Sequence, residues 1–221
     1  MPFRHERKHR ITALDRLVLR QRLGAVMQPD VHARDGTYRI RSLYFDDPRD
    51  TALREKLDGV NRREKFRIRC YNGDHSLIRL EKKCKVNGLC EKLSAPMTEE
   101  QVEKLLAGDT GWMESADPLL QELRCKMQWG LRPKTLVDYT REAWVFAPGN
   151  VRVTLDYDIR TGLRCTDFLD PDCPTVPAGD PTILMEVKWD GFLPGIIEDA
   201  IWLKGRRAEA FSKYAACRIY G

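Results

Sequence analysis

Two neighbouring segments of this chain each place a row of like charges on one face of a predicted strand. In EKFRIRCYNG (64–73), apolar and polar residues alternate, and the polar face carries Lys65, Arg67, Arg69 and Tyr71. Nearby, IRLEKKCKV (78–86) repeats the arrangement with Arg79, Glu81, Lys83 and Lys85. Like charges that face each other across a sheet repel. The two strands therefore require an environment that neutralises them.

The positive charge of the chain is concentrated in this hairpin. The formal net charge is +5, yet Arg62 to Lys92 alone contains ten basic residues against four acidic ones. The remainder of the chain is close to neutral. Such a distribution indicates a localised anion site, not a generally basic surface.

Turn and cap signals predict an antiparallel α+β domain that spans residues 1–221. Asn72-Gly73 and Asn87-Gly88 are strong hairpin turns, and strands are also expected at 37–45, 134–146, 151–159 and 182–189. Helices are predicted after Thr12, after Asp47 as N-cap with Pro48 in the first helical position, after Thr98 and after Asp117. One or two further helices are expected at the C-terminal end. The order of strands and hairpins argues against a doubly wound fold.

Composition excludes several classes of protein. No apolar run approaches the roughly 18 residues of a membrane span, and the N-terminus lacks the apolar stretch of a secretory signal. The seven cysteines form no Cys-x-x-Cys pair, so we expect them to be reduced and mostly buried in a cytoplasmic protein.

Charges at positions i and i+2 recur along most of the predicted strands. They are Arg4/Glu6/Lys8, Arg39/Arg41, Arg67/Arg69, Glu81/Lys83, Tyr139/Arg141, Arg152/Asp156 and Glu186/Lys188. One interpretation is a sheet with one wet face. The alternative is a closed antiparallel barrel of about eight strands with its charged face inward and helices outside, because a barrel of that size encloses a small ligand. The dominance of Arg and Lys favours this basic lumen.

Phosphates are the natural ligands of such a lumen, because arginine binds phosphate oxygens in pairs and lysine adds point charge. A nucleic-acid groove would combine basic residues with exposed aromatic side chains for base stacking. Here the basic rows carry only Tyr71 and Tyr139. We therefore expect no nucleic-acid partner.

A carboxylate stands among these cations in the segment LMEVKW, where Glu186 shares a face with Lys188. An acidic group in a phosphate site is useful if it holds a divalent metal that bridges phosphate oxygens. The sequence thus predicts Mn²⁺ or Mg²⁺ on Glu186, with Asp156 and Glu6 as weaker ligands. An ion pair with Lys188 or an arginine is the alternative.

These segments, in this order, resemble the polyphosphate polymerase domain of the vacuolar transporter chaperone (VTC) family, in its bacterial form. That family belongs to the triphosphate tunnel metalloenzymes, which are CYTH-like. The resemblance rests on RHERKHRI, SLYFD, KFRIRCYNG, LEKKCKVNGLCEK, DYTREAW, VTLDYD, LMEVK and FSKY. It implies a tunnel fold over nearly the whole chain. It also implies transfer of the γ-phosphate of ATP to a growing inorganic polyphosphate chain.

The resemblance also implies roles for individual residues. Phosphate contacts fall on Lys8, Arg67, Arg69, Lys83, Lys92 and Arg141, with Tyr139 as a hydroxyl donor, Glu186 as the metal ligand, and Ser212 and Lys213 on a C-terminal helix that closes one end of the tunnel. The charged rows add Arg39 and Lys188 as substrate contacts. We expect Arg67, Arg69, Lys83, Arg141 and Glu186 to carry the catalysis.

Two departures from the family pattern bear on the reaction. Tunnel hydrolases begin with Glu-x-Glu-x-Lys, whereas Arg4 takes the first Glu position here, and Ala210 stands where the eukaryotic polymerases carry a lysine. Fewer carboxylates favour transfer over hydrolysis. A triphosphatase and a non-catalytic polyphosphate-binding module remain the alternatives. ATP and inorganic polyphosphate or pyrophosphate are the expected ligands; a membrane-protein partner and the oligomeric state stay open.

Overall fold

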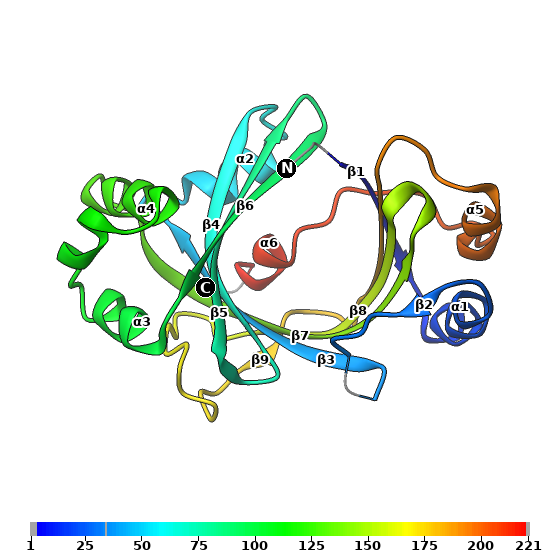
Figure 1. Ribbon diagram of the computed structural model, residues 1–221, viewed down its shortest axis with the longest axis horizontal. Helices are drawn as coiled ribbons and strands as arrows, with labels where there is room; N and C mark the ends of the chain where they lie inside the picture. The colour runs from blue at the N-terminus through cyan, green and yellow to red at the C-terminus, as the bar shows by residue number, and fades with distance from the viewer. Residues whose placement is uncertain (1–3, 34, 220–221) are drawn as a thin grey trace.

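One antiparallel sheet organises the chain in this computed structural model, which describes residues 4–33 and 35–219. Its main strands follow the spatial order β1-β10-β8-β7-β3-β4-β5-β6 (Figure 1). The short strands β2 and β9 pair with β7 and β8. The strands are β1 (His5–Ile11), β2 (Gln28–Pro29), β3 (Thr37–Asp46), β4 (Arg63–Tyr71), β5 (Asp74–Val86), β6 (Leu89–Met97), β7 (Arg132–Phe146), β8 (Val151–Thr161), β9 (Val176–Pro177) and β10 (Ile183–Trp189).

The sheet curls until its two edge strands meet. The backbone N–H of Arg4, just before β1, donates to the carbonyl of Cys90 on β6 over 3.3 Å. Within the described residues this isolated bridge is the pairing between the two edges, so the barrel closes at one point and not along a continuous ladder. The predicted closed α+β barrel of about eight strands is confirmed in this form.

Six α-helices and two short 3₁₀ helices are described. The α-helices are α1 (Ala13–Val26), α2 (Thr51–Leu57), α3 (Glu99–Leu106), α4 (Pro118–Gln128), α5 (Gly195–Ile201) and α6 (Lys213–Cys217), and the 3₁₀ helices are Gly111–Ser115 and Pro148–Asn150. Among these described segments, no helix is both long enough and apolar enough to cross a membrane.

Local sequence signals set most of the boundaries. The helices predicted after Thr12 and Thr98 are present as α1 and α3, and each of the two threonines forms a capping box at the start of its helix. Asn72-Gly73 and Asn87-Gly88 have the positive φ angles that a tight hairpin turn requires. The prediction for α2 was wrong at its start: the helix begins at Thr51, because the Asp47 carboxylate is used inside the preceding turn by the Arg49 and Thr51 amides.

The outer face of the barrel is apolar and is covered by helices on two sides. The helices α3 and α4 pack on β4, β5 and β6 through a core that includes Phe66, Ile68, Leu80, Leu105 and Leu123. On the opposite side, α1 and α5 cover β1, β8 and β10 through Leu19, Leu23, Val153, Val187 and Ile197. This arrangement turns the alternate, charged positions of these strands inward.

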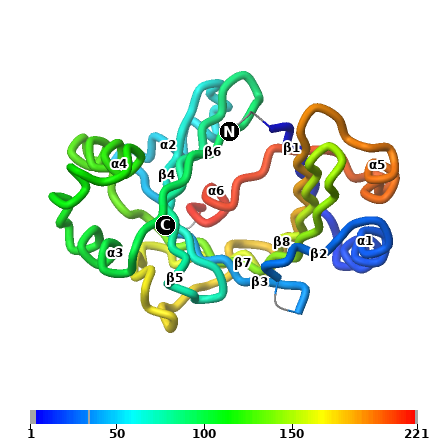
Figure 2. Tube along the Cα trace, in the orientation of Figure 1, coloured from blue at the N-terminus to red at the C-terminus, as the bar shows by residue number. Residues whose placement is uncertain are grey.

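The short helix α6 lies inside the curl of the sheet, between the β4–β6 side and the β1–β8–β10 side (Figures 1 and 2). Tyr214 and Cys217 of α6 pack on Ile40, Val137 and Tyr139 of β3 and β7. The Tyr214 hydroxyl donates to buried Asp46 over 2.6 Å. The inner face of β3 and β7 is therefore partly apolar, although Tyr44, Tyr139 and Arg141 of these strands still line the polar lumen.

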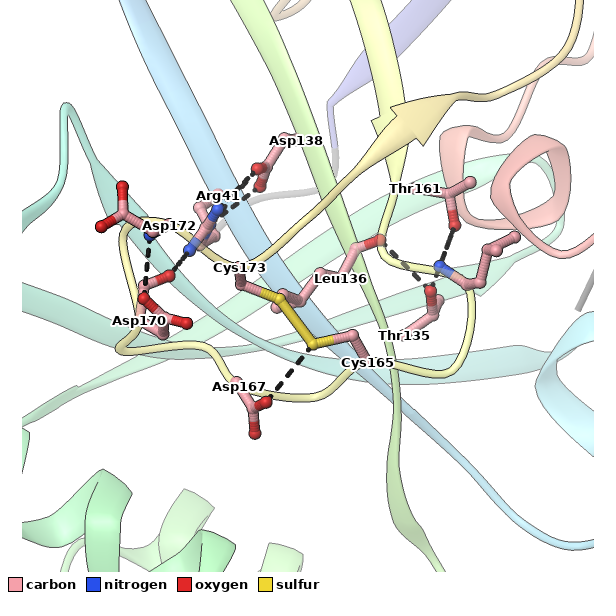
Figure 3. The surroundings of a disulfide bond; sticks show 11 residues. Arg41, Thr135, Leu136, Asp138, Thr161, Cys165, Asp167, Asp170, Asp172 and Cys173 are labelled. Carbon is pink, nitrogen blue, oxygen red and sulfur yellow. Dashed lines mark hydrogen bonds and ion pairs between the residues drawn. A yellow bond between two sulfur atoms is a disulfide. The ribbon is translucent and has the colours of Figure 1, made fainter.

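The cysteines correct the expectation of a fully reduced, mostly buried set. Cys165 and Cys173 form a disulfide in the loop between β8 and β9 (Figure 3). The loop folds back on itself. Arg41 holds it in place, because its guanidinium donates hydrogen bonds to the Asp138 carboxylate and to the Asp170 carbonyl. A separation of eight residues gives no signal for this pairing. Of the free cysteines, Cys70 and Cys217 are buried, whereas Cys84, Cys90 and Cys125 are half-buried or exposed.

Candidate functional site

A cavity of about 590 Å³ occupies the lumen of the barrel. Fourteen basic side chains line it against six acidic ones, so its wall is strongly positive. The basic residues are Arg4, Lys8, Lys56, Arg63, Lys65, Arg67, Arg69, Lys83, Lys85, Lys92, Arg141, Arg152, Lys188 and Lys213. For the members of the predicted charged rows in this set, such as Arg67, Lys83 and Arg141, the inward orientation is confirmed and the wet-face alternative is excluded.

On β4, β5 and β6, the cations Lys65, Arg67, Arg69, Lys83 and Lys92 form what we call the basic wall. Its counter-ion is Glu81, which is almost fully buried. Arg67 reaches the Glu81 carboxylate at 2.6 Å, Lys92 at 3.0 Å and Arg69 at 3.6 Å. Burial alone would raise the pKa of Glu81, but the three cations outweigh it and lower that pKa well below its usual value.

Glu81 is a site residue whose role the sequence did not reveal. It was visible as the one acid in the row of Arg79, Lys83 and Lys85. Its partners, however, lie on different strands, since Arg67 pairs with Glu81 across β4 and β5. Only the strand register brings them together.

Two tyrosines hold the arginines of the basic wall in place. Arg67 donates to the Tyr44 hydroxyl over 2.7 Å, and Arg69 donates to the Tyr139 hydroxyl over 3.0 Å. Tyr139 thus accepts here, and its own proton stays available for a ligand. Burial would raise the pKa of Tyr44, but Arg67 and Lys65 lower it to about 7. Tyr44 was not predicted, because an isolated tyrosine in SLYFD carries no sequence signal for this role.

On β1, β8 and β10, the acids Glu6, Asp156 and Glu186 form what we call the carboxylate wall. Glu186 lies 3.1 Å from Lys213, 3.4 Å from Lys8 and 3.6 Å from Lys188. Burial would raise the pKa of Glu186, but these three lysines hold it well below its usual value.

The other two carboxylates differ in access to the cavity. Glu6 lines the cavity beside Lys83 at 2.8 Å and Lys8 at 3.0 Å. Asp156 is fully buried behind the lining and is occupied by Arg141 at 2.6 Å and Lys213 at 2.5 Å. Glu6 and Glu186 thus face the lumen, whereas Asp156 positions Arg141 and Lys213.

Helix α6 brings Ser212 and Lys213 into the same cavity. The Ser212 hydroxyl accepts from the Ala215 amide at the start of α6 and from Lys65 of β4, each at 3.3 Å. Lys8 donates to the Phe211 carbonyl over 3.1 Å. The helix therefore bridges the basic wall and the carboxylate wall.

One predicted contact does not face the lumen. Arg39 is exposed and is absent from the cavity lining. On β3 the inward positions are the even-numbered ones, since Ser42 and Tyr44 bond Arg69 and Arg67. The odd positions point out, as Arg41 shows: it pairs with Asp138 and bonds the Asp170 carbonyl of the loop outside the barrel, and it does not line the cavity. The prediction that Arg39 contacts substrate is therefore wrong, because Arg39 occupies an odd, outward-facing position of β3.

Hard oxygen donors for a divalent metal are present in the lumen. Glu6 and Glu186 are both ionised, and both lie within ion-pair distance of Lys8 and Lys188. Two such carboxylates suit Mn²⁺ or Mg²⁺ when phosphate oxygens complete the coordination. A separate group of side chains with metal-ligand chemistry lies in the loop between β8 and β9. It consists of Cys165, Asp167 and Cys173, and the two sulfurs are bonded to each other (Figure 3).

Several solved structures are similar to this chain at low sequence identity. A putative adenylate cyclase from Bacillus halodurans superposes with a TM-score of 0.52 and 12% identity, over 84% of this chain and 81% of that one. A putative adenylate cyclase from Vibrio parahaemolyticus gives a TM-score of 0.46 and 12% identity over 89% and 81%. A protein from Pyrococcus horikoshii gives 0.48 and 12% over 90% and 85%. At 12% identity, the similarity to the Bacillus halodurans structure supports a shared fold alone.

The VTC domain family model matches residues 3–219, and the chain belongs to this family. No curated protein matches the chain. The resemblance found in the sequence motifs is therefore confirmed at the level of the family.

Proposed function

We propose that this protein is a metal-dependent polyphosphate polymerase, which transfers the terminal phosphate of ATP to inorganic polyphosphate inside the barrel. The observation that carries the proposal is the pairing of two opposed walls around one cavity. A strongly basic wall suits the phosphates of donor and acceptor, and the ionised Glu6 and Glu186 opposite suit the metal.

Positioning and charge neutralisation are the main requirements of phosphoryl transfer. Arg67 and Arg69, fixed by Glu81 and two tyrosines, would bind the donor phosphates, together with Lys83 and Lys92. Arg141 would neutralise charge on the transferred group, because Asp156 holds its guanidinium towards Glu186. A metal on Glu186 and Glu6, when bound, would neutralise phosphate charge.

The bond changes need no nucleophile from the protein. A terminal oxygen of the acceptor chain attacks the γ-phosphorus of ATP, and the bond from that phosphorus to the β–γ bridging oxygen breaks. The electron pair leaves with ADP. Lys8, Lys188, Ser212 and Lys213 would hold the acceptor end, since all four line the cavity between the two walls.

Hydrolysis with water as acceptor is the second candidate for the same cavity. Transfer is favoured because Arg4 replaces the first carboxylate of the hydrolase pattern, and here Arg4 pairs with Asp190 at 2.7 Å. A non-catalytic polyphosphate-binding module is the third candidate.

One product assay separates the three candidates. Purified protein is incubated with ATP and either Mn²⁺ or Mg²⁺, and phosphate products are resolved by chain length. Long-chain polyphosphate supports the polymerase, orthophosphate alone supports the hydrolase, and binding of tripolyphosphate without turnover supports the binding module.

A further inference from the structure

Among the described residues, four cations that line the lumen form no ion pair with a carboxylate. Ten of its fourteen basic side chains lie within 4.0 Å of an Asp or Glu. Within residues 4–33 and 35–219, no such ion pair involves the other four. We call them the unpaired basic row: Lys56, Arg63, Lys65 and Lys85.

These four residues are neighbours. Arg63 and Lys85 are directly opposite each other in the β4–β5 ladder, so their side chains project from the same place on the sheet. Lys65 lies two positions further along β4, on the same face. Lys56 belongs to α2, which contacts β4, and the charges of Arg63 and Lys85 act on it. The row therefore runs from α2 to the basic wall.

Unpaired like charges this close destabilise the empty protein. Burial lowers the pKa of Lys65 to about 8, and the nearby cations Lys83 and Lys8 contribute to that shift. The Lys65 ammonium donates to the neutral Ser212 hydroxyl over 3.3 Å. A row of cations that the protein itself leaves uncompensated is suited to a ligand that brings several negative charges in a line.

We propose that the unpaired basic row is the track along which the polyphosphate chain extends from the reaction site, so that the chain leaves the barrel past α2 and the start of β4. This inference rests on the proposed function and adds a direction to it. The remaining lining cations hold their own carboxylates, and a chain leaving elsewhere would have to displace those ion pairs. Among the described residues that line the cavity, the cations without such partners lie towards α2 and the start of β4.

The test compares a long ligand with a short one. The double variant Lys56→Gln/Lys85→Gln removes two charges from the far end of the row. Binding of long-chain polyphosphate and of tripolyphosphate is measured by calorimetry at low salt and without metal. We expect affinity for the long chain to fall about tenfold or more, since each charged contact contributes, and affinity for tripolyphosphate to change less than twofold.

The variant Lys104→Gln/Lys204→Gln is the matched control, because both lysines are exposed outside the lumen. It removes the same charge and should leave both affinities unchanged. The melting temperature of the ligand-free Lys56→Gln/Lys85→Gln variant should not decrease, because like charges are removed. A misfolded variant would instead show a lower melting temperature. In that case Lys65→Gln replaces it as the test variant, because it should raise the melting temperature and weaken the binding of long-chain polyphosphate.

The outcomes are distinct. If the track variant binds long chains as well as the wild type does, or loses both ligands equally, the track is wrong. If the wild-type protein binds polyphosphate but does not elongate it, the proposed function fails while the track can still be read from the binding data.

Discussion

The two walls of the cavity neutralise their charges in different ways. On the basic wall, the single buried carboxylate Glu81 serves Arg67, Arg69 and Lys92. On the carboxylate wall, three acids face a comparable number of cations, and every lysine near Glu186 is paired. The first wall thus retains capacity for anions, and the second retains ionised oxygens for a metal. In the proposed reaction, the donor and acceptor phosphates would bind between them.

The largest effect is expected on the carboxylate wall. Glu186→Gln should reduce chain elongation by about 1000-fold, in the range measured when a group that stabilises the transition state is removed. Binding of tripolyphosphate without metal should persist or improve, because a negative charge leaves the cavity. Elongation is measured by product length and binding by calorimetry. The control is Glu100→Gln on the exposed surface of α3. Full activity of Glu186→Gln would refute the metal assignment.

On the basic wall, the corresponding change should act mainly on stability. Glu81→Gln leaves Arg67 and Arg69 close together without their counter-ion, which should cost about 3 kcal/mol of unfolding free energy. Tripolyphosphate should restore part of this loss, since its phosphates replace the missing negative charge. Urea unfolding with and without the ligand measures both terms. A loss that is equal in the two conditions would show that the wall does not contact the anion.

The stability of the folded protein should decrease as the pH falls into the acid range. The pKa of Glu81 is lowered in the folded protein, so its contribution is present above the ordinary value of 4.5 and is lost as pH falls below it. Glu186 acts in the same direction. Glu81→Gln should therefore flatten the fall in stability between pH 5 and 3.

A smaller effect is expected on the alkaline side, where three groups that line the cavity have lowered pKa values. The pKa is about 7 for Tyr44 and about 8 for Lys65 and Lys188. The folded protein binds fewer protons than the unfolded chain above these values, so stability should rise from pH 7 to 9 at low salt. Above pH 9 the raised pKa values of Cys70 and Cys217 oppose the trend.

Tyr44→Phe should reduce this rise by about 1 kcal/mol, since it removes one of the groups that titrate in the window. Melting temperatures at several pH values provide the measurement. Tyr139→Phe controls for the loss of an arginine hydrogen bond. An unchanged slope in Tyr44→Phe would mean that the phenol does not ionise in the folded protein.

The smallest effect is expected outside the lumen. Arg39→Gln should change tripolyphosphate affinity and elongation less than twofold, because Arg39 is exposed on the outer face of β3. Arg69→Gln, the same change inside the lumen, should weaken tripolyphosphate at least tenfold. Equal effects of the two variants would contradict the assignment of inner and outer faces.

Local signals account for the parts of the fold that the sequence predicted. The capping boxes of α1 and α3 and the two Asn-Gly turns depend on residues within four positions of each other. The inward face of β4 was also predictable, because its outer positions are clearly apolar and its inner ones clearly basic. Strand β3 offers no such contrast, since buried residues occupy both of its faces, and Arg39 was therefore misplaced.

The missed features depend on contacts between distant segments. Glu81 gains its role from the register of β4 and β5, and Tyr44 gains its role from Arg67. The placement of α6 inside the curl rests on Tyr214 reaching Asp46, 168 residues away in sequence. Family resemblance placed Ser212 and Lys213 at the tunnel, but no local pattern indicates that a five-residue helix would lie there.

The central claim is that phosphates bind inside the barrel between the two walls. A crystal structure with tripolyphosphate and Mn²⁺ tests it most directly, because the anomalous signal locates the metal independently. We predict phosphates in contact with Arg67, Arg69 and Arg141 and the metal on Glu186. Phosphates bound only on the exterior, with an unchanged network of lumen ion pairs, would contradict it.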